Sequence, residues 1–402
     1  MARAACILPG SSGSRYSQAA VRRILAAILW FAPLLAMAAE NPPEGPAGSE
    51  HSCVVVAGAA RCWGANFSGQ LGDGTNVNRS MPVPVSGLSA GVGPMAAGSE
   101  HTCAVVADAV KCWGANFSGQ LGDGTNIDRN LPVNVSGPLR GVTAIAAGSE
   151  HTCAVLAGAV KCWGTNFSGQ LGDGTNIDRN APVDVTGISG NVVAIAAGSE
   201  HTCALTTGGA VWCWGANLSG QLGDGANVAR NRPVRVSGPL RGAIAIAAGA
   251  EHTCALVTGG EVWCWGANFS GQLGDGTNVD RNTPVGVAGL SGRVTAIATG
   301  AEHSCAVVAG RVRCWGANFS GQLGDGTDVD RNAPVGVSRL SGSVIAIAAG
   351  AEHSCAVVAD GVKCWGANFS GQLGDGTNVD RNAPVGVAGL PSPRPSVSVR
   401  IY

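Results

Sequence analysis

Hydrophobic residues along this chain occur in short runs, and glycine-rich polar segments separate the runs. In one representative stretch, apolar runs occupy 141–148, 151–157, 159–164 and 181–187, while the polar segment NFSGQLGDGTNIDRN occupies 166–180. No window shows a sustained period of 3.6 residues, which an amphipathic helix would require. The pattern therefore predicts four short β-strands, with a long ordered loop before the fourth.

This arrangement is repeated seven times along the chain. The segment CWGANFSGQLGDGTN returns almost unchanged in each repeat, and each copy follows an E-H-[ST]-C segment. A repeat of about 50 residues is typical of solenoids and propellers. Seven repeats of four strands predict an all-β, seven-bladed β-propeller, with a parallel β-helix as the alternative. All seven histidines of the chain lie in these segments, 50 or 51 residues apart: His51, His101, His151, His201, His252, His303 and His353.

The two ends of the repeat region indicate how the ring closes. The first repeat lacks the V-x-A-I-A strand that precedes every later E-H pair. The C-terminal segment 396–402 follows the last repeat where that strand would come next, and its apolar residues alternate as in a half-buried strand. We expect this segment to pair with the hairpin of the first repeat, which would remove an open sheet edge.

The N-terminal residues are typical of a signal peptide. In 1–38, two arginines precede an apolar run that ends in the small-x-small sequence Ala-Met-Ala. We expect cleavage after this segment, a linker over 39–48 and the propeller over 49–402, with a retained anchor as the alternative. These boundaries predict a secreted, periplasmic or cell-surface protein with no stable membrane insertion after cleavage.

Charge and motif content narrow the possible functions. Without residues 1–38 the chain carries 21 basic and 26 acidic side chains, a net charge of −5. This balance argues against a nucleic-acid partner, because contact with phosphates requires a basic surface. The sequence has no P-loop, no G-x-S-x-G, no H-E-x-x-H and no dinucleotide-binding fingerprint. We therefore expect no cofactor and no catalytic activity.

The unit EHTCAVVADAVKCWGANFSGQLGDG resembles the repeat of the regulator of chromosome condensation family. The signature of that repeat is a histidine-containing strand, a hairpin and a W-G-x-N-x-x-G-Q-L-G-x-G turn. The resemblance covers about residues 47–390 and implies a seven-bladed propeller. Members range from nuclear exchange factors for a small GTPase, through ubiquitin-ligase adaptors, to secreted bacterial proteins, one type of which inhibits β-lactamases. The fold alone does not decide among these functions.

Each repeat contains two cysteines, nine or ten residues apart. Folding AVVADAVK as a hairpin places Cys103 opposite Cys112 in a non-hydrogen-bonded pair, with Cα atoms about 4.5 Å apart, within reach of a disulfide. Such bonds persist in exported proteins, whereas fourteen reduced cysteines packed as small apolar residues are the alternative. The predicted disulfides are Cys53–Cys62, Cys103–Cys112, Cys153–Cys162, Cys203–Cys213, Cys254–Cys264, Cys305–Cys314 and Cys355–Cys364.

The histidines and the polar loops have both chemical and structural interpretations. A histidine two residues before a cysteine suits a Cys–His nucleophile, but sevenfold repetition favours a buried imidazole bonded to neighbouring backbone or to the loop. The tryptophan of each CWG is expected to fill the core between blades. We expect no metal site, since neither zinc spacings nor a calcium-loop spacing occurs, and we expect Asp128 and Arg129 to pair locally or at a blade edge.

Recognition residues are sought where the repeats differ, and repeats four and five differ most. The residue before the second cysteine is lysine or arginine in five repeats but Trp212 and Trp263 in these two. Because lysine or arginine indicates a solvated position, we expect two exposed aromatic side chains on adjacent blades. Tryptophan and arginine are frequent interface anchors, although V-W-C-W-G is also interpretable as a common form of the repeat with no partner. Repeat four adds a basic edge: Arg230, Arg232, Arg235 and Arg241.

These patterns predict a monomeric, secreted propeller that binds another protein and catalyses no reaction. One alternative is a regulator of a small GTPase that resembles a guanine-nucleotide exchange factor, which would require a cytosolic or nuclear chain. A second alternative is a secreted inhibitor of an extracellular enzyme such as a β-lactamase.

Overall fold

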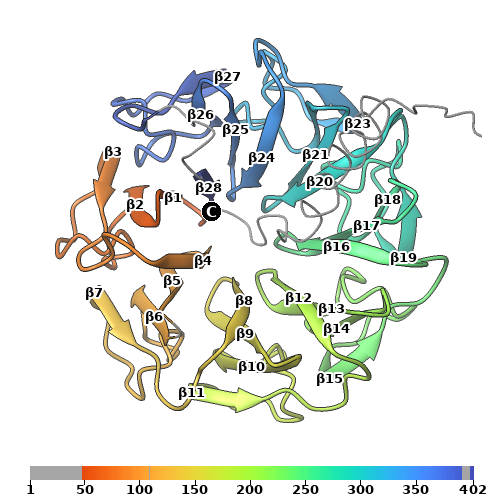
Figure 1. Ribbon diagram of the computed structural model, residues 1–402. Helices are drawn as coiled ribbons and strands as arrows, with labels where there is room; N and C mark the ends of the chain where they lie inside the picture. The colour runs from red at the N-terminus through yellow and green to blue at the C-terminus, as the bar shows by residue number, and fades with distance from the viewer. Residues whose placement is uncertain (1–47, 108, 392–398) are drawn as a thin grey trace, which may run out of the picture. The chain divides into compact units, whose positions relative to one another are not determined.

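The computed structural model describes residues 48–107, 109–391 and 399–402. These residues form seven four-stranded antiparallel sheets, which Figure 1 shows as the blades of a ring. The predicted all-β, seven-bladed propeller is confirmed, and the β-helix alternative is wrong. The described part of the chain contains no helix that is long and apolar enough to cross a membrane.

Each blade has its innermost strand beside the axis of the ring and its outermost strand at the rim (Figure 1). From inside to outside, the blades are β28 (Val399–Ile401), β1 (His51–Val56), β2 (Ala59–Gly64) and β3 (Arg79–Pro84); β4 (Val92–Ala97), β5 (His101–Val106), β6 (Ala109–Gly114) and β7 (Arg129–Asn134); β8 (Val142–Ala147), β9 (His151–Leu156), β10 (Ala159–Gly164) and β11 (Arg179–Asp184); β12 (Val192–Ala197), β13 (His201–Thr206), β14 (Val211–Gly215) and β15 (Arg230–Arg235); β16 (Ala243–Ala248), β17 (His252–Val257), β18 (Val262–Gly266) and β19 (Arg281–Gly286); β20 (Val294–Thr299), β21 (His303–Val308), β22 (Arg311–Gly316) and β23 (Arg331–Gly336); β24 (Val344–Ala349), β25 (His353–Val358), β26 (Gly361–Gly366) and β27 (Arg381–Gly386).

The two middle strands of each blade form the predicted hairpin. In blade two, β5 pairs with β6 so that Cys103 lies opposite Cys112 and Val106 opposite Ala109. In blades four and five the extra residue lies in the turn, and the cysteines still face each other. All seven predicted disulfides are present, each with Cα atoms 4.1 Å apart.

The antiparallel hairpins give the ring two distinct sides. The turn of each hairpin lies on one side, which we call the hairpin side. On the other side, the start of the second strand meets the end of the third, as His101 meets Gly114. We call this the loop side, because the long loop between the third and fourth strands begins there. The loops are 65–78, 115–128, 165–178, 216–229, 267–280, 317–330 and 367–380.

The hydrophobic core lies between neighbouring blades rather than within them. Between blades two and three, Trp163 packs with Cys112 and Leu121 of the preceding blade and with Ile145 of its own, and all four are buried. The indole lies against Gly122, where an added Cβ would come within 2.7 Å of Nε1, so this position requires glycine. The same cluster recurs at the other interfaces, and each blade therefore depends on both neighbours for its stability.

The ring closes as predicted, by the C-terminal strand. Strand β28 pairs antiparallel with β1, with Ile401 opposite Val54, and Ile401 is fully buried among residues of blades one and seven. Tyr402 exchanges backbone hydrogen bonds with Cys53 and packs on the opposite face of the strand. The innermost strand of blade one therefore comes from the end of the chain.

The expectations for the signal peptide and for most of the linker lie outside the described residues. Gly48, the last residue of the expected linker, is buried against the imidazole of His51. Of the closing segment 396–402, the structure describes only the last four residues.

Candidate protein-interaction surfaces

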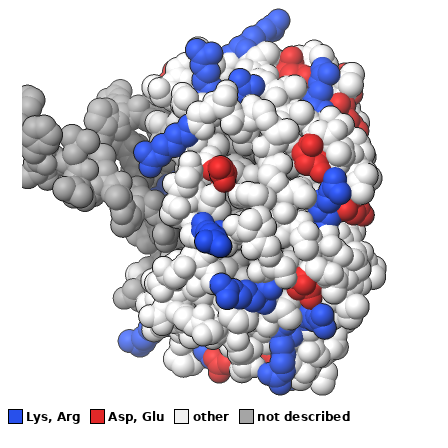
Figure 2. Space-filling view, turned by 90° about the vertical axis from the view of Figure 1, so that its right-hand side faces the viewer, with Lys and Arg blue, Asp and Glu red and all other residues white. Residues whose placement is uncertain are grey.

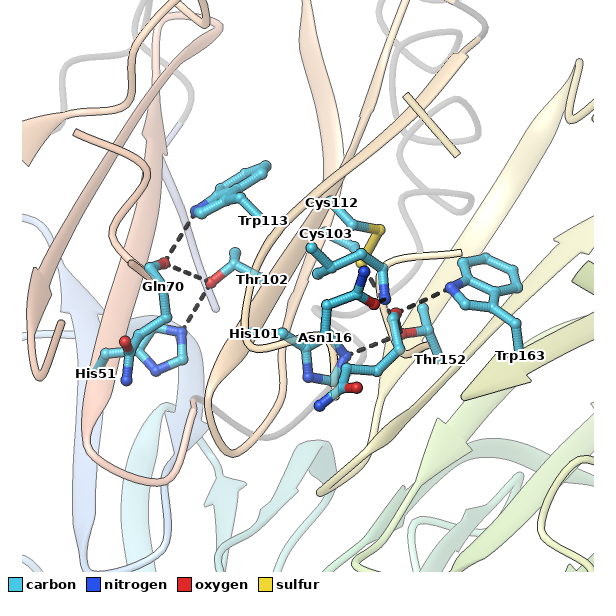
Figure 3. Close-up of a disulfide and its surroundings, with 12 residues drawn as sticks. His51, Gln70, His101, Thr102, Cys103, Cys112, Trp113, Asn116, Thr152 and Trp163 are labelled. Carbon is cyan, nitrogen blue, oxygen red and sulfur yellow. Dashed lines mark hydrogen bonds between the residues drawn. A yellow bond between two sulfur atoms is a disulfide. The ribbon is translucent and has the colours of Figure 1, made fainter. Parts of the chain in front are cut away.

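The histidines of the E-H segments connect neighbouring blades through a buried chain of hydrogen bonds (Figure 3). Nε2 of His51 lies 2.8 Å from Oγ1 of Thr102 in the next blade. That hydroxyl and Nε1 of Trp113 both lie 2.9 Å from the backbone oxygen of Gln70. Because a carbonyl oxygen only accepts and a hydroxyl has one proton, Thr102 donates to Gln70 and accepts from His51. The Nε2 atom of the imidazole therefore carries a proton.

The same network recurs at every blade interface, including the one where the ring closes. There Nε2 of His353 lies 2.8 Å from the hydroxyl of Ser52 in blade one, and Ser52 donates to the backbone oxygen of Gln372. All seven imidazoles are fully buried, and burial lowers the pKa of His101 to about 4 and that of His51 to about 3. The predicted structural role of the histidines is confirmed, although the partner is a hydroxyl side chain rather than backbone or loop.

The long loops are held by their own buried asparagines. Nδ2 of Asn116 donates to Asp123 and to the backbone oxygens of Thr125 and Ile127, and its Oδ1 accepts from the backbone N–H of Leu121. The expected pairing of Asp128 with Arg129 is wrong, because each of the two side chains has a different partner. Arg129 pairs with Asp123 at 3.1 Å, and Asp128 instead accepts from the backbone N–H of Asn116. No cluster of metal-ligating side chains occurs among the residues that the structure describes.

Trp212 and Trp263 are half-buried, which corrects the expectation that both are exposed. Lys161 and the basic residues at the same position of other blades are half-buried too, since a basic side chain can pack its aliphatic stem against the protein and keep its charged end at the surface. Lysine at this position was therefore no evidence of full exposure. Trp212 lies between Ala204 and Arg235 across the sheet, and its Nε1 has no hydrogen-bond partner among the described residues.

The four arginines of blade four do not form one basic edge. Arg230 pairs with Asp224 at 3.1 Å, as the equivalent arginine does in all seven blades, and so it belongs to the shared fold. Arg232 reaches the preceding blade, where its Nη1 donates to Thr186. Arg235 and Arg241 lie near the hairpin side and are exposed. Of the four arginines, Arg235 lies opposite Trp212 in the sheet, and Arg241 is in the loop that follows the same strand.

Sequence reasoning missed a ring of exposed apolar side chains on the loops. Each loop exposes one phenylalanine or leucine near its start and one valine or isoleucine near its end, although the surrounding loop residues are mostly polar or glycine. The seven near the start are 55–84% exposed. The sequence feature that could have revealed this ring was the recurrence of an aromatic residue inside the polar N-F-S segment. The exposed side chains are Phe67, Phe117, Phe167, Leu218, Phe269, Phe319 and Phe369, followed by Val77, Ile127, Ile177, Val228, Val279, Val329 and Val379.

A ring of glutamates accompanies these apolar residues on the loop side. The serine after each phenylalanine or leucine donates to the glutamate of the next E-H segment, as Ser68 does to Oε2 of Glu100 at 2.8 Å. The other carboxylate oxygen, Oε1, has no partner among the described residues. The seven glutamates are Glu50, Glu100, Glu150, Glu200, Glu251, Glu302 and Glu352.

Comparison with known proteins agrees with this architecture. Residues 62–401 match the sequence profile of the RCC1-like domain. The E3 ubiquitin-protein ligase HERC2 of Homo sapiens is 40% identical over 104 residues, which are 25% of this chain and 2% of HERC2. The Ultraviolet-B receptor UVR8 of Arabidopsis thaliana is 38% identical over 87 residues, 21% of this chain and 20% of UVR8. The matched segments thus span only a small share of these relatives.

Two solved structures extend the likeness to the whole ring. Human WBSCR16 superposes with a TM-score of 0.75 at 24% identity, covering 86% of this chain and 96% of that one. Yeast RCC1 (Prp20), solved with Kap60 bound, superposes with a TM-score of 0.74 at 23% identity, covering 86% and 85%. At these identities the likeness shows a shared fold.

Proposed function

The chain belongs to the RCC1-like domain family, and from this premise we propose that it is a secreted protein-binding module without catalytic activity. The observation that carries the proposal is that the reactive side chains of the repeats, histidine and cysteine, have structural roles. The histidines are buried and neutral between blades, and the paired cysteines are oxidised. What every blade exposes instead is a pair of apolar side chains on a loop fixed by internal hydrogen bonds. Rigid exposed apolar residues suit recognition.

Seven disulfides support a location outside the reducing cytosol. They favour the secreted inhibitor of an extracellular enzyme over the exchange factor for a small GTPase, because an exchange factor would act where such bonds are reduced. Adding the mature protein to an assay of an extracellular β-lactamase tests that narrower version. Unchanged hydrolysis at a large molar excess would remove it while leaving the binding proposal intact.

We propose blades four and five as one candidate binding surface for a protein partner. Trp212 and Trp263 replace the lysine or arginine found in the other blades, and the exposed Arg235 and Arg241 belong to the same blade as Trp212. Half-burial reduces the area that each indole offers to a partner. The contribution expected from this contact is therefore smaller than that of a fully exposed pair of anchors.

Capture experiments test the proposed function. The mature protein, immobilised with its disulfides intact, should retain a protein from the native extracellular fraction. A reduced and alkylated sample serves as the control, because it presents the same sequence without the folded surface. Retention of the same proteins by both samples, or no retention by the folded one, would contradict the proposal.

A further inference from the structure

Each glutamate of the ring directly follows a residue that lines a hollow shared by the seven blades. The residues that immediately precede the glutamates, such as Gly98 and Ser99, line a narrow hollow of about 60 Å³ to which all seven blades contribute. Each glutamate is fixed by one hydrogen bond from the loop of the preceding blade, at 2.8–3.2 Å. No lysine or arginine among the described residues pairs with any of the seven. The loop side therefore carries seven oriented carboxylates with an unused oxygen each.

Exposed aromatic side chains accompany the carboxylates on the same loops that hold them. Phe67 immediately precedes Ser68, the residue that binds Glu100, so an exposed ring belongs to the residue next to the one that holds the carboxylate. Six of the seven blades have phenylalanine here and blade four has Leu218. A cationic side chain placed between them would contact both a carboxylate and the face of an aromatic ring, two favourable contacts for lysine or arginine.

Charges are unequally divided between the two sides of the ring. Six exposed aspartates of the long loops, none of which pairs with a lysine or arginine, add to the glutamates on the loop side: Asp128, Asp178, Asp280, Asp328, Asp330 and Asp380. The hairpin side carries most of the remaining bases, among them Arg140, Arg241, Arg293 and Arg311, all exposed. The edge-on view in Figure 2 shows more basic side chains toward one side of the ring and most of the acidic ones toward the other.

Glu302 lies close enough to other carboxylates of the loop side for their charges to act on it. The pKa of Glu302 is raised, first by partial burial and then by the negative charges of Glu352, Asp330 and Glu251, against the opposing hydrogen bond from Ser270. A cationic partner would relieve this repulsion.

We propose that the loop side is the docking surface for a lysine- and arginine-rich polypeptide segment, held by the glutamate ring and the phenylalanines beside it. The proposal rests on the function proposed above and names the chemistry of the partner. Because the charges lie at the surface, salt screens the attraction, and the affinity falls as ionic strength rises. The hairpin side, which is basic, does not bind such a segment.

Binding of a fluorescent oligolysine peptide of about ten residues to the mature protein, followed by fluorescence anisotropy at low salt, tests the proposal. One triple variant, Glu100→Gln, Glu150→Gln and Glu200→Gln, keeps an acceptor for each serine but removes three charges from the loop side. The matched control, Asp184→Asn, Glu261→Gln and Asp360→Asn, removes three charges from the hairpin side. We expect about a tenfold weaker affinity for the first variant and less than a twofold change for the second.

Three results would overturn the proposal: no binding of oligolysine at low salt, an equal loss of affinity in both variants, or preferential binding of an oligoglutamate peptide. Circular dichroism and melting curves show whether either variant has lost its fold. A second variant, Phe117→Ser with Phe167→Ser, removes two exposed rings without changing charge and should also weaken binding. A partner captured through the hairpin side would overturn this inference while leaving the proposed protein-binding function standing.

Discussion

Mild acid should destabilise the folded protein, because its seven histidines are buried as neutral imidazoles. Burial is the main cause that lowers their pKa, to about 3 for four of them and about 4 for the other three, from 6.5 in an exposed chain. The folded-state pKa is the lower one, so protons bind first to the unfolded chain as the pH falls below about 6.5. The free energy of unfolding then decreases until the pH reaches the folded-state pKa.

The expected magnitude is large. One pKa unit corresponds to about 1.4 kcal/mol for each group, so each histidine removes about 2 kcal/mol between about pH 7 and pH 5. Seven together remove about 13 kcal/mol, which is comparable with the whole stability of a typical domain, about 5–15 kcal/mol. Asp123 and five of its equivalents have a lowered pKa and lose their contribution only below their ordinary value of 3.8. Glu302, whose pKa is raised, opposes the trend as a single group.

Guanidinium unfolding followed by tryptophan fluorescence, with the disulfides intact, measures this effect. The free energy of unfolding should fall steeply over this pH range, with a slope near pH 5 that corresponds to uptake of about seven protons. A His101→Gln variant is the control. It should be less stable near pH 7, and its slope should be smaller by about one proton. A free energy of unfolding that stays constant between about pH 7 and pH 5 would refute the buried neutral histidines.

Three further predictions concern the disulfides, the closing strand and the candidate contact on blades four and five. Thiol titration of residues 39–402, denatured without reduction, should find almost no free cysteine, and close to fourteen would refute the disulfides. Deleting 399–402 removes the buried Ile401 and Tyr402, worth about 1.5–3 kcal/mol for each side chain, and should lower the melting temperature markedly; an unchanged melting curve would contradict closure. Changing Trp212 and Trp263 together to lysine should leave the fold intact and weaken binding of a captured partner severalfold, whereas unchanged affinity would exclude blades four and five.

The fold was predictable because every repeat carries the same local signals. A hairpin register follows from counting residues between Cys103 and Cys112, and seven near-identical copies leave little ambiguity about the blade count. The closing strand was predictable for a related reason, since the first repeat lacks one strand and the segment after the last repeat supplies it.

The candidate surfaces were less predictable, because exposure depends on contacts between blades. Lysine at the position equivalent to Trp212 suggested full solvation, but Lys161 and its basic equivalents are half-buried, because the aliphatic stem of a basic side chain can pack against the protein. The partner of Arg129 could not be chosen between two nearby aspartates without the loop conformation, which places Asp123 beside it and turns Asp128 toward a backbone N–H. The glutamate ring depends on the approach of Ser68 to Glu100, 32 residues apart in the sequence.

The position of bound cationic side chains tests the central claim most directly. A zero-length carbodiimide reaction joins a lysine amine to a carboxylate in contact with it, so mass spectrometry of the cross-linked complex with oligolysine identifies the carboxylates that bind. The account predicts adducts on the glutamates of the loop side, Glu100 and its equivalents. Adducts concentrated on Asp184, Glu261 and Asp360 of the hairpin side would contradict it.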